Sequence, residues 1–279
     1  MDGIKNKDVE GLKFEELTEI VELVRNIHEF DFSNYSNASL KRRFERLLIS
    51  NHWDIIDLKT KITNEPKFLD FLIREITVNV TEMFRDPDFY NSLILNVLPY
   101  LESYQRIKVW NAGVSSGEEL YSFTILFKDS NLYKKSFFYG TDINTKVLEV
   151  AKNGIYPIKT MKLFAESYTK TNLKSSFSEY FTTEYQHSII NSELKKNCLF
   201  SVHNLISDSV FNEFQLVSCR NVLIYFDQEL QLKVVNLLID SLCLFGFLCL
   251  GSKEVIRNPE ALIRLKVIDS KQNIYQKIK

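Results

Sequence analysis

From about residue 107 the sequence repeats a strand, a loop and a helix, and this alternation restricts the fold more than any other feature. "IKVW" (107–110) leads into the small-residue loop "NAGVSSGEEL", and "SFFYGTD" (136–142) leads into "INTKVLEVAKNG", where Gly154 is placed to end a helix. Strands that alternate with helices predict an α/β protein with a doubly wound, mostly parallel, Rossmann-like sheet. Further segments with this pattern are expected as strands at 198–202, 214–219 and 246–252 and as a helix at 228–242. The tail "LKVIDSKQNIYQKI" has the pattern of two strands around a turn, which predicts a terminal antiparallel hairpin.

The segment before this region has a helical pattern. Apolar residues recur at three-to-four spacing from Phe14 to Ile27, which predicts an amphipathic helix. A second helix is expected over "SLKRRFERLL" with Ser39 as its N-cap, and a third begins near Pro66. We therefore expect two domains, a helical N-terminal domain at 1–76 and an α/β domain at 77–279. A small β insertion is expected within the second domain, at about 155–203.

Charge and cysteine spacing exclude several classes of protein. The net charge of −1 comes from 35 basic and 36 acidic residues, so no overall field favours nucleic acid or an anionic membrane. The four cysteines lack metal-ligand spacing and are interpreted as reduced core thiols, with no metal site. The charged first residues are unlike a signal peptide, and the apolar run "LCLFGFLCL" is too short to span a bilayer. We expect a cytoplasmic, monomeric protein without direct membrane insertion.

Polar residues follow the ends of the predicted strands, where ligands of open α/β sheets bind. In the first loop, Gly113 and Gly117 would let the backbone approach a ligand, whereas Glu118-Glu119 would repel a pyrophosphate. Asp142, after the next strand, is the type of acid that accepts hydrogen bonds from ribose hydroxyls. An adenosyl group attached to a positive charge fits both observations, and we expect S-adenosylmethionine with Glu119 facing its aminocarboxyl end.

Two later strand ends carry the pairs Asn204-Leu205 and Arg220-Asn221. The second pair lies between the apolar runs "FQLVSC" and "VLIYF", where a buried and unpaired charge would cost several kcal/mol or more. Each of these residues alone has an ordinary explanation, as a helix-dipole partner, a turn residue or a solvated strand end. Their joint placement at successive strand ends favours one binding site.

Four segments in order, "TVNVTEMFRD", "VWNAGVSSGEELYS", "GTDINTKVLEVAKNGIY" and "CRNVLIYF", resemble the CheR-type chemotaxis-receptor glutamate methyltransferases over nearly the whole chain. The resemblance implies transfer of a methyl group from S-adenosylmethionine to receptor glutamates, leaving S-adenosylhomocysteine. It implies that Arg85 and Tyr225 lie nearest the transferred methyl group and act in catalysis. It also implies a set of cofactor-binding residues, namely Asn79, Thr81, Arg85, Glu119, Asp142, Asn204, Leu205, Arg220 and Asn221.

The resemblance further implies that the helical domain binds the acidic helical bundle of the receptor in the cytoplasm. Arg42, Arg43 and Arg46 recur at three-to-four spacing away from the apolar face, which suggests a basic docking surface. The β insertion lacks the glycine-rich turn of family members that bind a receptor's C-terminal peptide, so we expect docking independent of such a tether.

Two alternatives from other classes are a nicotinamide-dependent oxidoreductase and a non-catalytic adenosyl-binding signalling module. The missing GxGxxG motif and the two acids in the first loop disfavour the oxidoreductase. The presence of both Arg85 and Tyr225 disfavours the non-catalytic module.

Overall fold

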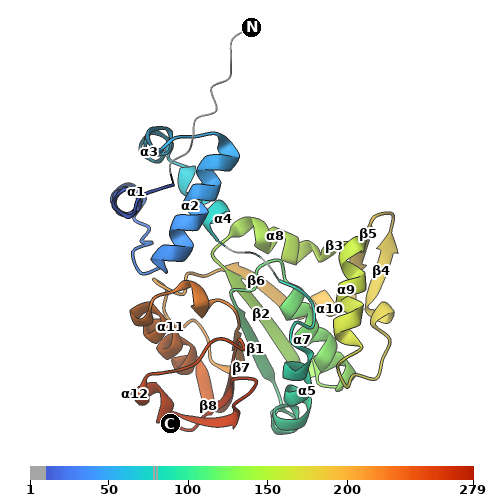
Figure 1. Cartoon of the computed structure of the whole chain (residues 1–279). Helices are drawn as coiled ribbons and strands as arrows, with labels where there is room; N and C mark the ends of the chain where they lie inside the picture. Colours follow the sequence, from blue (N-terminus) through green and yellow to red (C-terminus); the bar gives the residue numbers. More distant parts are fainter. Residues whose placement is uncertain (1–10, 78, 80) are drawn as a thin grey trace. The chain divides into compact units, whose positions relative to one another are not determined.

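The computed structural model describes residues 11–77, 79 and 81–279, which divide into two compact units. The first unit, Met1–Val78, also takes in the later segment Tyr225–Leu230. The second unit comprises Asn79–Ile224 and Gln231–Lys279 (Figure 1). Within the described residues, no helix is long and apolar enough to cross a membrane.

The first unit is helical. Its helices bury one apolar face each, with Val24 of the first and Phe44 of the second fully buried. Phe14 and Ile27, at the ends of the predicted apolar stripe, are instead 54% and 40% exposed. The helices are α1 (Phe14–His28), α2 (Asn37–Asn51), α3 (Ile55–Asn64) and α4 (Phe68–Ile76).

Two predicted helix starts in this unit are wrong by a few residues. Helix α2 has Ser36 rather than Ser39 as its N-cap, because the Ser36 carbonyl already accepts a hydrogen bond from Leu40 N at 2.9 Å. Pro66 precedes α4, whose N-cap is Lys67. Phe68 N donates to the Glu65 carbonyl at 3.0 Å, so Pro66 occupies the second position of a tight turn, where its fixed φ is favourable.

The second unit contains a sheet whose seven described strands run in the order β6-β2-β1-β7-β8-β10-β9. Neighbours from β6 to β8 pair in parallel, and β10 pairs antiparallel with both β8 and β9. The predicted doubly wound sheet with a terminal hairpin is therefore confirmed. The strands are β1 (Ile107–Ala112), β2 (Ser136–Asp142), β6 (Cys198–Val202), β7 (Phe214–Cys219), β8 (Leu242–Leu250), β9 (Leu265–Asp269) and β10 (Ile274–Lys277).

Helices cover this sheet on both faces, with α5 and α7 on one side and α11 and α12 on the other (Figure 1). Gly154 ends α8 with a left-handed φ of 62°, as the sequence predicts. The helices are α5 (Pro87–Asn96), α6 (Leu98–Leu101), α7 (Glu118–Asp129), α8 (Thr145–Asn153), α9 (Ile158–Tyr168), α10 (Ser192–Lys195), α11 (Gln228–Asp240) and α12 (Pro259–Leu262). Short 3-10 turns occur at η1 (Tyr133–Lys135), η2 (Phe177–Tyr180) and η3 (Leu223–Tyr225).

A smaller antiparallel sheet forms in the region where a β insertion is expected. Its three described strands run in the order β3-β5-β4. Ile155–Pro157, directly after Gly154, pairs with the hairpin that the other two strands form. The strands are β3 (Ile155–Pro157), β4 (Phe181–Glu184) and β5 (His187–Ile190).

The order of strands creates a switch point between β1 and β7. From β1 the chain proceeds to β2 and β6 on one side, and then returns to β7 on the other side of β1. The loops that leave the carboxyl ends of β1 and β7 therefore turn apart, which is where open α/β sheets form a binding crevice. Asn111 of β1 lies opposite Ser218 of β7 in the register, so both side chains reach this point.

The cysteines are all within the described residues and all are free thiols. Cys219, Cys243 and Cys249 are buried, whereas Cys198 is half-buried. Among the described residues, no three histidine, cysteine, aspartate or glutamate side chains are grouped to hold a metal ion.

Candidate functional site

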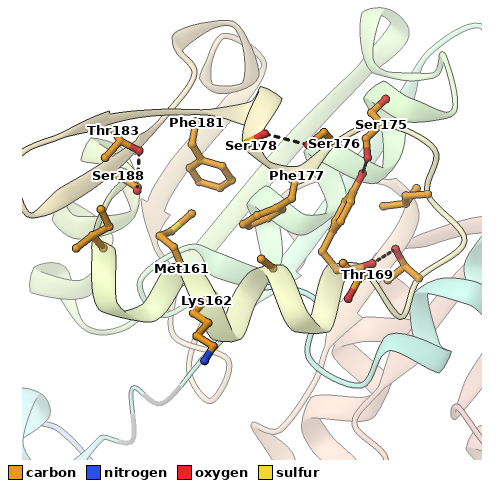
Figure 2. Close-up of a pocket in the computed structure, with 15 residues that line it drawn as sticks. Met161, Lys162, Thr169, Ser175, Ser176, Phe177, Ser178, Phe181, Thr183 and Ser188 are labelled. Carbon is orange, nitrogen blue, oxygen red and sulfur yellow. Dashed lines mark hydrogen bonds between the residues drawn. The ribbon is translucent and has the colours of Figure 1, made fainter.

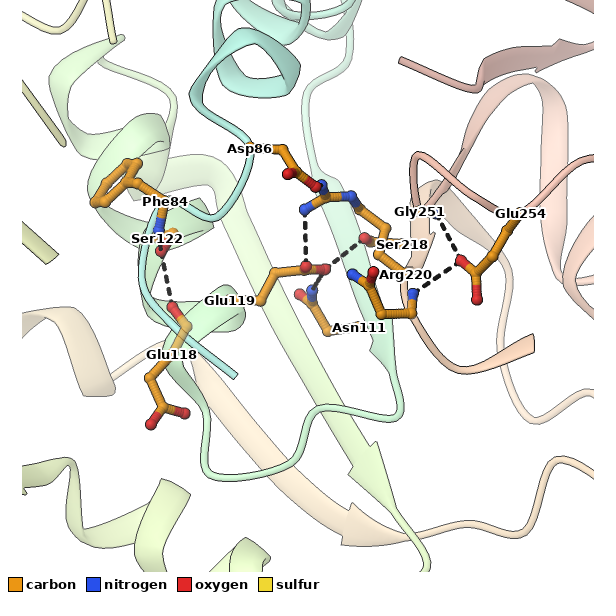
Figure 3. A network of polar contacts seen from close by, with 11 residues as sticks. Phe84, Asp86, Asn111, Glu118, Glu119, Ser122, Ser218, Arg220, Gly251 and Glu254 are labelled. Carbon is orange, nitrogen blue, oxygen red and sulfur yellow. Dashed lines mark hydrogen bonds and ion pairs between the residues drawn. The ribbon is translucent and has the colours of Figure 1, made fainter. Parts of the chain in front are cut away.

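A buried arginine lies at the switch point. The guanidinium of Arg220 donates from Nη1 to Glu119 Oε2 at 3.0 Å and from Nη2 to Asp86 Oδ2 at 2.8 Å (Figure 3). The ring of Phe89 lies 3.9 Å from the guanidinium carbon. The Arg220 side chain is only 1% exposed, so these carboxylates replace the water that its Nη1 and Nη2 lose, whereas its buried Nε has no hydrogen-bond partner among the described residues.

The two carboxylates explain how this charge can be buried. Burial by itself lowers the pKa of Arg220, but Glu119, Tyr90 and Asp86 together raise it above its usual value. Arg220 therefore remains a cation between two anions. The sequence does not indicate Asp86, because it is 134 residues away from Arg220. It also stands directly before Pro87, a position typical of a helix N-cap.

Glu119 is held from three directions. Besides Arg220, its Oε1 accepts hydrogen bonds from Asn111 Nδ2 at 3.0 Å and from Ser218 Oγ at 2.6 Å. The Oδ1 of Asn111 is buried and has no hydrogen-bond donor in the described part of the chain. A buried acceptor without a donor is costly, and a ligand with an N–H group would satisfy it. An ammonium group beside Glu119 fits this arrangement.

Asp142 ends β2 and fixes the loop that follows β1. Its carboxylate accepts the backbone N–H groups of Ser115 and Asn144, both at 2.9 Å. Burial raises the pKa of Asp142, although these N–H groups oppose the rise. A carboxylate has about four acceptor positions, so Asp142 retains capacity for the hydroxyls of a ribose.

Gly113 and Gly117 allow close packing around the loop that follows β1. Both have left-handed backbones, with φ of 73° and 94°. A Cβ at Gly113 would lie 2.5 Å from a methyl of Val222, and one at Gly117 would lie 2.9 Å from Ala151 Cβ. The expectation that these glycines let the backbone approach a ligand stays a prediction.

The other predicted strand-end residues also lie in structured loops. Asn204 Oδ1 accepts Ile206 N at 3.0 Å, and Leu205 is buried. Asn221 has a left-handed φ of 61°, and its N–H donates to Glu254 Oε2 at 2.8 Å. Glu254 was not predicted, although its position after β8 at a further strand end is a signal that could have identified it.

Arg85 lies between two left-handed residues, Phe84 and Asp86. The Phe84 ring is buried and its N–H donates to Ser122 Oγ at 2.9 Å, while Asp86 pairs with Arg220. Arg85 itself is half-buried and makes no hydrogen bond or ion pair with the described residues. Its guanidinium is therefore available to a ligand or substrate. Asn79 and Thr81 are half-buried, and their roles in cofactor binding stay predictions.

Tyr225 and Arg43 belong to the helical unit. The guanidinium carbon of Arg43 lies 5.3 Å from the centre of the Tyr225 ring, and Arg43 Nη1 donates to the Ile76 carbonyl at 3.0 Å. Arg43 is half-buried, and its part in a basic docking surface stays a prediction. Arg42 and Arg46 are exposed. The expected place of Tyr225 beside the methyl group stays a prediction.

A separate pocket of about 690 Å³ lies between α9 and the small sheet (Figure 2). Its lining is apolar at Met161, Phe177 and Phe181 and rich in hydroxyls elsewhere. It contains none of the predicted cofactor-site residues.

Comparison with known proteins identifies close relatives. Residues 79–272 match the family model described as "CheR methyltransferase, SAM binding domain". The Pseudomonas putida protein named "Putative methyltransferase Cher3" is 39% identical over 99% of this chain and 100% of its own length. A chemotaxis protein methyltransferase of Listeria innocua is 32% identical over 82% of this chain and 86% of its own. An uncharacterised 104.1 kDa protein of Rhodobacter capsulatus is 31% identical over 87% of this chain, which spans only 26% of that protein.

Proposed function

The chain belongs to the CheR methyltransferase family, and we propose that it methylates glutamate side chains of chemotaxis receptors. Family membership makes it an S-adenosylmethionine-dependent methyltransferase that acts in chemotaxis, and it disfavours the nicotinamide-dependent alternative. The glutamate substrate and the receptor are the proposed parts. The observation that best supports the glutamate substrate is the half-buried guanidinium of Arg85, which makes no ion pair with the described residues and can attract a carboxylate.

The residues at the strand ends suit the parts of the cofactor. Asp142 would accept the ribose hydroxyls, and Glu119 with Asn111 Oδ1 would accept the ammonium of the aminocarboxyl end. Asn79, Thr81, Arg85, Asn204, Leu205, Arg220 and Asn221 complete the proposed cofactor-binding set. The bound cofactor supplies a methyl group activated by its sulfonium.

The proposed reaction needs little chemical assistance from the protein. An ionised glutamate is already a nucleophile, so no general base is required. Because carboxylate and sulfonium charges disappear during transfer, exclusion of water and correct alignment should supply most of the rate enhancement. We assign Arg85 to steering the substrate carboxylate and Tyr225 to hydrogen bonding near the methyl group. The contact of Arg85 with the carboxylate is loose, since a tight bidentate pair would weaken the nucleophile.

The proposed partner is the cytoplasmic helical bundle of a receptor, bound by the helical domain of a monomeric enzyme. We propose a domain boundary near residue 76, and docking that does not require a receptor's C-terminal peptide.

A methyl-transfer assay with receptor cytoplasmic fragments tests this function. Wild-type protein and tritiated S-adenosylmethionine should give base-labile label, as glutamate methyl esters do. Arg85→Ala should lower the rate by roughly 100-fold, because misplacement of a reacting group has effects of that size. Arg106→Ala, which alters an exposed arginine outside the site, is the matched control.

Full transfer and normal cofactor binding by Arg85→Ala would refute its assigned role. Normal binding of S-adenosylhomocysteine by the wild type without any base-labile label on receptors would instead favour the non-catalytic adenosyl-binding module.

A further inference from the structure

The carboxylate of Asp86 does not cap the helix that follows it. Asp86 precedes α5, where an aspartate commonly caps the helix, but its side chain makes no capping hydrogen bond. It pairs with Arg220 instead, at 2.8 Å. The Asp86 backbone is left-handed, with φ of 58° and ψ of 71°, a conformation that is unfavourable for most residues. The chain therefore accepts local strain, and this turn directs the carboxylate to the guanidinium.

Asp86 also sets the charge of the cluster. Asp86 and Glu119 carry two negative charges and Arg220 carries one positive charge, so the three side chains together are anionic. Arg220 is 1% exposed and Glu119 15%, so the attraction between these two is only weakly screened by solvent, whereas Asp86 is 37% exposed and its attraction to Arg220 is partly screened. The neighbouring cation, Arg85, forms no ion pair with any described residue, this cluster included. Without Asp86, the one positive charge of Arg220 would cancel the charge of Glu119.

We propose that Asp86 is a positioning residue that gives this site its preference for a cationic ligand group. By sharing Arg220, Asp86 leaves the Glu119 carboxylate with uncompensated negative charge, which the ammonium of the cofactor neutralises. Asp86 acts through Arg220 and Glu119, and it needs no contact with the ligand. The inference rests on the proposed location of the cofactor at this edge of the sheet.

Two ligands that differ in the amino-acid part separate this role from a merely structural one. S-adenosylhomocysteine carries the ammonium group, whereas 5′-methylthioadenosine keeps the nucleoside and the thioether without it. In Asp86→Asn the side chain keeps its shape and tolerates the left-handed backbone but loses its charge. Calorimetry should show the Kd of S-adenosylhomocysteine raised about tenfold and that of 5′-methylthioadenosine changed less than about threefold. Asp88→Asn, at an exposed aspartate in the first turn of α5, should change neither Kd.

Equal weakening of both ligands, or no weakening of either, would overturn the inference. If Asp86→Asn does not fold, as judged by circular dichroism, Asp86→Gly provides the same comparison, because glycine adopts the left-handed conformation without strain. Failure of the wild type to bind S-adenosylhomocysteine would refute the proposed cofactor location itself, and this inference with it. A loss confined to the Asp86 variants leaves that location intact.

Discussion

Among single residues, the adjacent acids Glu118 and Glu119 differ in their partners and their surroundings. Glu119 is paired with Arg220, whereas Glu118 points away from that cluster (Figure 3). Glu118 is 7% exposed, and Ser116 Oγ donates to its oxygens at 3.0 and 2.7 Å. Burial raises the pKa of Glu118 to about 7, with Ser116 opposing the rise. Of the two acids, the sequence assigns only Glu119 to the cofactor site, and Glu118 makes none of the contacts of the Arg220 cluster.

The raised pKa predicts a pH dependence of stability. Between its ordinary pKa of 4.5 and about 7, Glu118 holds its proton in the folded protein and loses it in the unfolded chain. The folded state binds more protons, so rising pH destabilises it, by roughly 3 kcal/mol in total across this window. Glu118→Gln removes this titration. Its stability relative to wild type, measured by urea unfolding, should therefore increase as pH rises through the window.

The exposed Glu149 on α8 provides the control, since Glu149→Gln should show no such trend. A stability difference between Glu118→Gln and wild type that is independent of pH would show that the Glu118 carboxyl is not desolvated.

The sequence predicts site residues most readily where they directly follow a strand. Asp142 and Arg220 are predicted in this way, because the ends of parallel strands meet at one edge of a sheet. Asp86 was missed, because its partner Arg220 is 134 residues away and no local pattern indicates the pairing. The contact of Arg43 with Ile76 was missed for a related reason, since it depends on how α2 and α4 pack.

At the scale of elements, strand positions follow from the sequence more closely than the ends of helices. Predicted strands at 136–142, 198–202 and 214–219 match β2, β6 and β7. Strand β8 begins at Leu242, earlier than expected, because "LCLF" is uniformly apolar and does not mark where α11 ends. Helix starts depend on which carbonyl accepts the first hydrogen bond, and several adjacent polar residues can satisfy that need.

The loop between β1 and α7 depends on Gly117 for its close contact with α8. Gly117→Ala should destabilise the protein by about 2–4 kcal/mol, combining the cost of a left-handed alanine with the overlap against Ala151. Urea unfolding measures this loss. In the double variant with Ala151→Gly the overlap with the methyl group is gone. The loss of unfolding free energy in the double variant should therefore be smaller than the sum of the losses in the two single variants.

Strictly additive losses would mean that Ala151 does not limit this position. The backbone cost alone would then account for the effect of Gly117→Ala.

At the scale of the whole molecule, the grouping of Tyr225–Leu230 with the helical unit could not be predicted from the sequence. Ser36 N donates to the Tyr225 carbonyl at 2.9 Å, and Asp227 N donates to the Asn34 carbonyl at 2.9 Å. Phe226 packs against Tyr35 with ring centroids 5.3 Å apart. These contacts join segments almost 200 residues apart in sequence, so only the folded chain reveals them.

The arginines of α2, in the same unit, differ in exposure: Arg43 is half-buried, whereas Arg42 and Arg46 are exposed. This difference leads to a prediction about receptor docking. Arg42 and Arg46 are exposed and form no ion pair with described residues, so their charges are available to an acidic partner. Replacing both with alanine should raise the Michaelis constant for receptor fragments several-fold at low ionic strength, and salt should reduce the difference. Calorimetric affinity for S-adenosylhomocysteine should not change. The pair Arg106→Ala and Lys266→Ala removes the same charge from exposed positions outside this helix and should leave the Michaelis constant unaltered.

Arg43→Ala should behave differently from those variants. It removes the donor to the Ile76 carbonyl and the cation over the Tyr225 ring, so it should lower the free energy of unfolding by about 1–3 kcal/mol. Thermal unfolding compared across the variants distinguishes the structural arginine from the docking pair. If methylation instead collapsed on deletion of a receptor's last residues and ignored the Arg42 and Arg46 substitutions, recognition would depend on a tether and not on this helix.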